Sequence, residues 1–287
     1  MTTYRVRHQT TYTYSAEVSA SYGRGHLRPR DLPWQRLVEH SLTVDPLPTD
    51  VGEEQDAYGN PDTYFHVTTD HRRLQVTGSS VVEVERPAWD ADAATRPWEE
   101  AVPTRRRDIE AMDFVLASPR VDLSEDTHAY AAVSFTPGRP LIEAVEDLSQ
   151  RIHREFRYDK GATTVSSRVG DVLSARAGVC QDFAHLTVAC LRTLGLAARY
   201  VSGYLATRPP PGRPRVVGAD ASHAWAAVWV PGGTWVHVDP TNDQFANDRY
   251  CTLAWGRDYS DVPPIRGVIF TDARESTLEV SVDVAPL

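Results

Sequence analysis

The chain is poor in cysteine and lysine and has no long apolar run, and each shortage excludes a class of protein. Its 287 residues include 3 cysteines and no CxxC pair, so neither a disulfide scaffold nor a structural zinc knuckle has support. Lys160 is the only lysine, and no basic block is present that could bind nucleic acid or an anionic membrane. No segment approaches the roughly 20 apolar residues of a membrane helix.

The charge balance and the first residues suggest where the protein works. The formal net charge is −9, and the sequence pI is about 5.6. The opening stretch MTTYRVRHQTTYTY lacks the apolar core of a secretory signal. We therefore expect a cytoplasmic protein that binds neither nucleic acid nor membrane.

The first part of the chain is typical of short antiparallel strands. Residues 1–86 alternate apolar and polar side chains, and turn-forming residues interrupt them at 45–50 and 56–62. This pattern predicts an antiparallel β-sandwich. Prolines near 87–97 end it, which predicts a β-rich domain over 1–92 and a second domain over 93–287 that includes further C-terminal strands.

The second part begins with helical patterns. Apolar residues at three- and four-residue steps predict one helix over about 140–157 and another over about 180–194, which Gly195 ends. Cys180 begins the second helix on its apolar stripe, so its sulfur should face the packed side. Asp182, His185 and Arg192 lie away from that stripe.

A hairpin follows, and its turn sets the register of two strands. PGG separates HAWAAVWV (223–230) from TWVHVD (234–239). With a three-residue turn, odd-numbered residues share one face, and Asp239 lies diagonal to His223, roughly 7–8 Å away. A four-residue turn would put Asp239 on the opposite face.

Cys180, His223 and Asp239 together have the chemistry of a thiol-dependent acyl transfer. A helix N-terminus and a nearby imidazolium stabilise a thiolate, which is the nucleophilic form of cysteine. A histidine can take the thiol proton and return it to the departing amine, while a carboxylate holds the imidazole in one tautomer. The N–H groups at the helix start can donate to an oxyanion.

The residues alone leave alternatives open. Asp220 competes with Asp239 as the orienting carboxylate, and His185 and His237 compete with His223 as the base. His185 points off the cysteine's face and is interpreted as a surface or supporting residue, and Cys190 in mid-helix as inert. A zinc site made of the cysteine, histidine and aspartate would lack any recognised ligand spacing.

The motifs GVCQDFAHL and DASHAWAAVWVPGG resemble those of the bacterial transglutaminase-like family, and DAYGNPDTYFHV resembles its N-terminal β domain. The resemblance covers nearly the whole chain. It implies an α+β fold whose papain-like core packs a catalytic helix on an antiparallel sheet. It also implies Cys180 as nucleophile, His223 as base and Asp239, rather than Asp220, as the orienting acid. The sequence has no DxDxDG calcium loop, so we expect no metal and no cofactor.

Two functions are consistent with this resemblance. The first is attack on a peptide or protein amide through a thioester, which an amine acceptor resolves by transfer or water resolves by hydrolysis. A tunnel lined by Trp225 and Trp229 would favour the amine, and an open cleft would favour water. The second is a non-catalytic scaffold or protein-binding role on a lapsed enzyme fold. The substrate-binding residues and the oligomeric state are not predicted.

Overall fold

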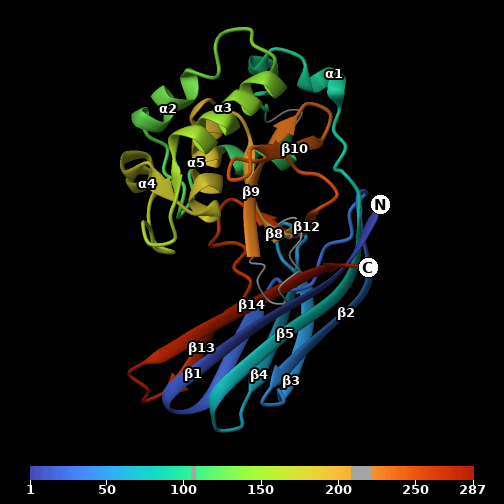
Figure 1. Cartoon of the computed structure of the whole chain (residues 1–287), viewed down its shortest axis with the longest axis vertical. Coiled ribbons are helices and arrows are strands. Elements are labelled where there is room, and N and C mark those ends of the chain that lie inside the picture. The colour runs from blue at the N-terminus through green and yellow to red at the C-terminus, as the bar shows by residue number, and fades with distance from the viewer. Residues whose placement is uncertain (105–107, 208–221) are drawn as a thin grey trace, which may run out of the picture.

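Five antiparallel strands form from the first 84 residues, as the alternation of side chains predicts. The computed structural model describes residues 1–104, 108–207 and 222–287. These strands form one end of an elongated molecule, and the helices lie at the other end (Figure 1). The strands are β1 (Thr2–Gly25), β2 (Gln35–Asp45), β3 (Asp50–Gln55), β4 (Pro61–Val67) and β5 (His71–Val84).

The long strand β1 organises this sheet, whose order is β2-β5-β1-β4-β3. Its first half pairs with β5 and its second half with β4. Val44 and Val76, from β2 and β5, nevertheless pack in one cluster with Phe65 and Val67 of β4. The sheet therefore folds back on itself about β1, and the antiparallel β-rich N-terminal part of the predicted fold class is confirmed.

The two C-terminal strands join this sheet rather than the core with which the sequence analysis grouped them. β13 (Arg266–Thr271) and β14 (Ser276–Pro286) both pair with β1. The reason is that β14 covers an otherwise open edge of β1 and buries Val282 and Val284 in the same cluster as Tyr4 and Val6. Alternation predicted the strands but could not identify their partner.

The rest of the chain forms the helical layer and a five-stranded sheet in the order β11-β10-β9-β8-β12. Its strands are β8 (Ala198–Leu205), β9 (Ser222–Val230), β10 (Thr234–Asp239), β11 (Gln244–Phe245) and β12 (Tyr250–Gly256), with β6 (Arg157–Tyr158) and β7 (Ala177–Gly178) as a separate parallel pair. The helices are α1 (Ala91–Ala94), α2 (Glu125–Ala132), α3 (Leu141–Glu155), α4 (Val169–Ala175) and α5 (Cys180–Thr193), with 3-10 turns at Trp98–Ala101 and Ile109–Val115. None of the helices in the described ranges is long and apolar enough to cross a membrane.

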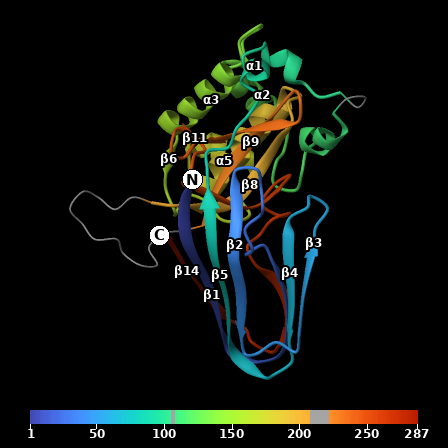
Figure 2. The ribbon, with the colours of Figure 1, turned by 90° about the vertical axis from the view of Figure 1, so that its right-hand side faces the viewer.

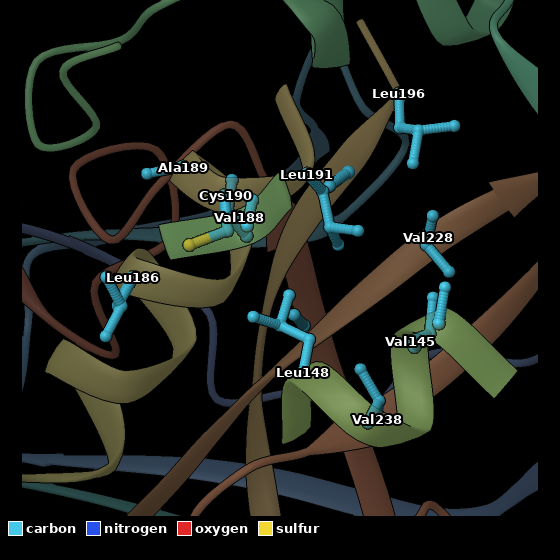
Figure 3. Packing of buried hydrophobic residues seen from close by; sticks show 14 of the residues in the cluster. Val145, Leu148, Leu186, Val188, Ala189, Cys190, Leu191, Leu196, Val228 and Val238 are labelled. Atoms are coloured by element: carbon cyan, nitrogen blue, oxygen red, sulfur yellow. The ribbon is translucent and has the colours of Figure 1, made fainter. Parts of the chain in front are cut away.

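Helices α3 and α5 are fixed on the sheet by one apolar cluster. Val145 and Leu148 from α3 meet Leu191 from α5 and Val228 and Val238 from the sheet (Figure 3). Burying each such side chain contributes about 1.5–3 kcal/mol. The cluster therefore holds the helix that begins at Cys180 firmly against β9 and β10.

The β9–β10 hairpin has the predicted three-residue turn. Val230 pairs with Thr234, and Trp229 pairs with Trp235. Gly232 and Gly233 have φ of 102° and 95°, a backbone region that favours glycine. Even-numbered strand residues face the helices, so the odd-numbered ones, Asp239 included, lie on the opposite face of the sheet.

The polar side of α5 is not solvent-exposed, which corrects the prediction for His185. Asp182, His185 and Arg192 are all buried, at 2 to 3% exposure. Arg192 donates to the carbonyl oxygens of Ala198 and of Arg257, a residue far along the chain. The helix is enclosed because distant segments cover its second face, and a helical stripe does not reveal such partners.

Candidate active site

The start of α5 is fixed by a buried carboxylate. Asp182 accepts hydrogen bonds from the backbone N–H of Val179 at 2.8 Å and from the Thr163 hydroxyl at 2.6 Å. Burial raises the pKa of Asp182, and these two bonds oppose that rise. Glycine is needed at 178, because a Cβ there would lie 2.8 Å from the Asp182 side chain. The GVCQD motif thus packs the chain tightly just before the thiol.

His223 and Asp239 form a short hydrogen bond across the hairpin. The His223 Nε2 atom lies 2.7 Å from the Asp239 Oδ2 atom, and Asp239 is fully buried. Burial alone lowers the pKa of His223, but Asp239 and the Cys180 thiol raise it by more, to about 10. Burial likewise opposes ionisation of Asp239, yet His223 keeps the pKa of that carboxyl below its usual value.

Cys180 completes the arrangement from the helix side. The Cys180 thiol lies close enough to the His223 ring to raise the pKa of the imidazole. Because Asp239 occupies the Nε2 atom, the Nδ1 atom is the ring nitrogen left for the sulfur. Both residues open onto a cleft of about 350 Å³, lined by Tyr158, Cys180, Leu205, Thr207, Ser222, His223, Thr241 and Asn242. The structure therefore brings the three predicted residues together.

The competing bases lie elsewhere. His185 is buried beside Tyr200, and its Nε2 atom accepts the Tyr259 N–H at 3.1 Å. Burial lowers its pKa to about 4. His237 is buried on the odd-numbered face, where its Nδ1 atom accepts the Trp225 indole N–H. The competing carboxylate, Asp220, lies outside the described residues.

Comparison with known proteins places this geometry in a family. The bacterial transglutaminase-like N-terminal region matches residues 4–83, and the transglutaminase-like superfamily matches residues 123–240. An uncharacterized protein of Mycobacterium tuberculosis is 50% identical over 99% of this chain and 92% of its own length. Another uncharacterized protein, from Mycobacterium leprae, is 34% identical over 99% of this chain and 98% of its own length.

The chain belongs to the bacterial transglutaminase-like family. A crystal structure described as a candidate cysteine protease, from Cytophaga hutchinsonii, shares this fold. It has a TM-score of 0.75 and 19% identity, and the match covers 100% of this chain and 98% of that one. The predicted family and the α+β fold class with a transglutaminase-like core are thereby confirmed.

The two carboxylate oxygens of Asp239 in this transglutaminase-like core have different hydrogen-bond partners. Its Oδ1 atom accepts the backbone N–H groups of Thr241 and Asn242, as a turn-forming aspartate does. Its Oδ2 atom accepts from His223, from the Asn242 amide and from the Tyr250 hydroxyl, the last two at 2.7 Å. The turn therefore orients the carboxylate toward the histidine.

Three residues near the site were missed from the sequence. Asn242 and Tyr250 support Asp239, and only the position of Asn242 three residues after it could have suggested this. Tyr158 lines the cleft because β6 pairs it with Gly178, two residues before the cysteine. A parallel ladder of two residues leaves no readable pattern. Within the described ranges, no group of three or more His, Cys, Asp and Glu side chains could hold a metal ion.

The His223–Asp239 pair should make stability depend on pH in a defined way. The pKa of His223 rises from 6.5 to about 10 on folding, so its contribution is complete below about pH 6.5 and is lost as the pH rises toward 10. Asp239, whose pKa is lowered, contributes above about pH 3.8 and loses that contribution as the pH falls further. Thermal melts should show the largest Tm loss for His223→Gln between about pH 4 and 6.5. An equal Tm loss at pH 6 and pH 10 would contradict the ion pair.

Proposed function

We propose that this protein is a thiol-dependent enzyme that attacks a peptide or protein amide through Cys180, His223 and Asp239. The observation that carries the proposal is that the Cys180 thiol and the His223 imidazole line one cleft, and that the imidazole is hydrogen-bonded to a fully buried carboxylate. Membership of the transglutaminase-like superfamily supports the same chemistry. Each residue has a distinct role in it.

In the first half of the reaction, the Cys180 sulfur attacks the amide carbonyl carbon and a tetrahedral oxyanion forms. The His223 imidazolium gives its proton to the departing amine, the C–N bond breaks, and a thioester to Cys180 remains. Asp239 keeps the Nε2 atom protonated, so the Nδ1 atom faces the reacting groups.

The oxyanion needs donors next to the sulfur. The N–H groups of Cys180 and Gln181 lie in the first turn of α5, where no carbonyl within the helix can accept them. Tyr158 lines the same cleft, and its hydroxyl is a candidate for the second donor. Burial raises the pKa of Tyr158, and the nearby thiol adds to the rise, so its hydroxyl stays protonated and able to donate.

In the second half of the reaction, water or an amine takes the acyl group from the thioester, and the described residues favour water. The expected tunnel walls, Trp225 and Trp229, pack on the odd-numbered face against Tyr250 and Trp235 and are not among the residues that line the cleft. Nothing in the described lining therefore excludes water from the thioester. We propose hydrolysis as the main outcome, with transfer to an amine as the alternative.

Thiol reactivity should distinguish Cys180 from the other cysteines. Cys190 and Cys251 are fully buried, and burial raises the pKa of both thiols to about 12. Iodoacetamide at pH 7 should therefore alkylate Cys180 faster by on the order of 100-fold or more, as read by peptide mapping. His223→Ala should slow labelling at Cys180, while His128→Ala, at an exposed histidine, should not.

The reaction itself is tested by incubating the protein with a peptide library, with and without a primary amine, and reading products by mass. Cleaved peptides in both arms support hydrolysis, and amine adducts in the second arm support transfer. Absence of any product, together with slow labelling of all three cysteines, would overturn the proposal in favour of a non-catalytic scaffold.

A further inference from the structure

A second cavity lies at the other end of the β9–β10 hairpin from the thiol. It has a volume of about 470 Å³ and is formed where the N-terminal sheet meets the core. Its lining includes Trp34, Arg86, Arg199, Thr234, Trp235 and Trp255. Thr234 lines this cavity, whereas the cleft at Cys180 lies beside Asp239. Thr234 and Asp239 are five residues apart on β10, which corresponds to about 16 Å along the strand. The two sites are therefore separate.

The most unusual group in this cavity is the Arg199 guanidinium. Arg199 is only 5% exposed, and its Cζ atom lies 4.1 Å from the Trp235 ring centre and 3.7 Å from that of Trp255. Its Nε atom is buried with no hydrogen-bond partner in the described part of the chain. Burying a cation without a paired carboxylate is costly, so its retention calls for a function.

Two further unpaired donors lie nearby. The Trp34 indole N–H is buried and has no partner among the described residues, and the Trp34 ring lies 5.5 Å from the His237 ring. The His237 Nδ1 atom accepts from Trp225, so the proton of the neutral ring is on Nε2, which is also buried and has no partner in residues 1–104, 108–207 and 222–287. Arg199 pairs with Ala227 across the sheet, and Ala227 pairs with His237, so both side chains lie on the same face.

We propose that this cavity binds the carboxylate of an organic acid that carries an aromatic or apolar body. Arg199, held between two indole rings, presents the edge of its guanidinium, whose paired N–H groups match the two oxygens of a carboxylate. Trp34, which lines the cavity, supplies a neighbouring indole N–H, and the indole walls accommodate the apolar body.

The charges around the cavity favour an anion with a single charge. Glu85 is the one carboxylate among its described lining residues, while Arg86 and Arg199 also line it. Arg30, whose Cζ atom lies 3.6 Å from the Trp255 ring centre, is not among the described lining residues, so the lining carries one net positive charge. The remaining walls are mostly indole and aliphatic, so a phosphate dianion would lack the donors that its second charge needs.

The direct test is isothermal titration calorimetry of the whole protein with phenylacetate and with its neutral isostere phenylacetamide. The two probes differ only in the group that Arg199 would bind, and loss of a charge-assisted hydrogen bond costs roughly tenfold or more in affinity. We expect phenylacetate to bind at least about tenfold more tightly. Equal affinities, or no binding of either probe, would overturn the proposal.

Variants locate the binding. Arg199→Met retains the packing between the indoles and should lose the preference for phenylacetate over phenylacetamide. If that variant does not fold, Trp34→Phe is the second test, and it should weaken the same preference. Cys180→Ala should bind phenylacetate as the wild type does, so a failure of this proposal is distinguishable from a failure of the proposed catalysis. An undiminished preference in both folded variants would overturn the assignment to this cavity.

A parallel titration identifies the source of the carboxylate. N-acetylglycylphenylalanine carries the same acid and aromatic ring at the end of a peptide. Tighter binding of this peptide than of phenylacetate supports the carboxylate site with a chain terminus as its ligand. Tighter binding of phenylacetate supports the same site with a free organic acid as its ligand.

Discussion

Replacing Cys180 by alanine is expected to abolish amide turnover while leaving the fold intact. The sulfur is the atom that forms the proposed thioester, and loss of a nucleophile in such triads costs on the order of 10⁶ in kcat. Cys180 is only partly buried at the exposed start of α5, so the loss in unfolding free energy should stay below about 1 kcal/mol. Product formation by mass and a urea titration measure the two effects.

Cys190→Ala is the matched control, because it should have the opposite pattern. Cys190 is fully buried in the cluster between α5 and its neighbours (Figure 3). Its removal leaves a small cavity and should cost about 1 kcal/mol or more of stability, yet turnover should persist. Turnover by Cys180→Ala at a rate near that of the wild type would end the nucleophile assignment.

Replacing Asp239 by asparagine should lower the rate of amide turnover by about 10⁴-fold in a protein that still folds. The amide has the shape of the carboxylate, but it cannot hold the His223 imidazole in the required tautomer or stabilise its charged form. Steady-state kinetics near neutral pH measure the loss.

Tyr250→Phe is the control for this prediction. It removes one hydrogen bond to the Asp239 Oδ2 atom, while the bonds from His223 and Asn242 remain. Its effect on turnover should be roughly tenfold or less. A wild-type rate in Asp239→Asn would show that another carboxylate orients the histidine, with Asp220 the first candidate.

The hairpin could be read from the sequence because its information is local. PGG sets a three-residue turn, the turn sets the register, and the register places Asp239 on the face of His223. The start of α5 at Cys180 was equally readable, since a clear apolar stripe begins there. These two elements position the candidate site.

The features that could not be predicted from the sequence depend on contacts between distant parts of the chain. His185 is buried because the segment around Tyr259 covers it, and β14 leaves the core because β1 offers an open edge. Tyr250 reaches Asp239 from β12, on the far side of the sheet order from β10. No periodicity in the sequence encodes these pairings.

The arrangement of the two sheets also explains how a second cavity can exist near the first. The N-terminal sheet lies next to the core (Figure 2). Tyr4 and Val82 of the sheet pack in one buried cluster with Tyr200 and Leu253 of the core. The His8 Nδ1 atom and the Tyr204 hydroxyl add a buried hydrogen bond of 2.9 Å across this junction. Across this junction, Trp34 from the N-terminal part and Arg199 from the core line the same cavity.

The existence of an acyl-enzyme on Cys180 is the central claim, and acid-quenched mass spectrometry tests it most directly. The protein would be mixed with a cleaved peptide, quenched within the first turnover and digested for mapping. We predict an added acyl mass on the peptide that contains Cys180, absent from His223→Ala. Rapid product formation with no adduct on Cys180 at any quench time, and undiminished in Cys180→Ala, would contradict the account.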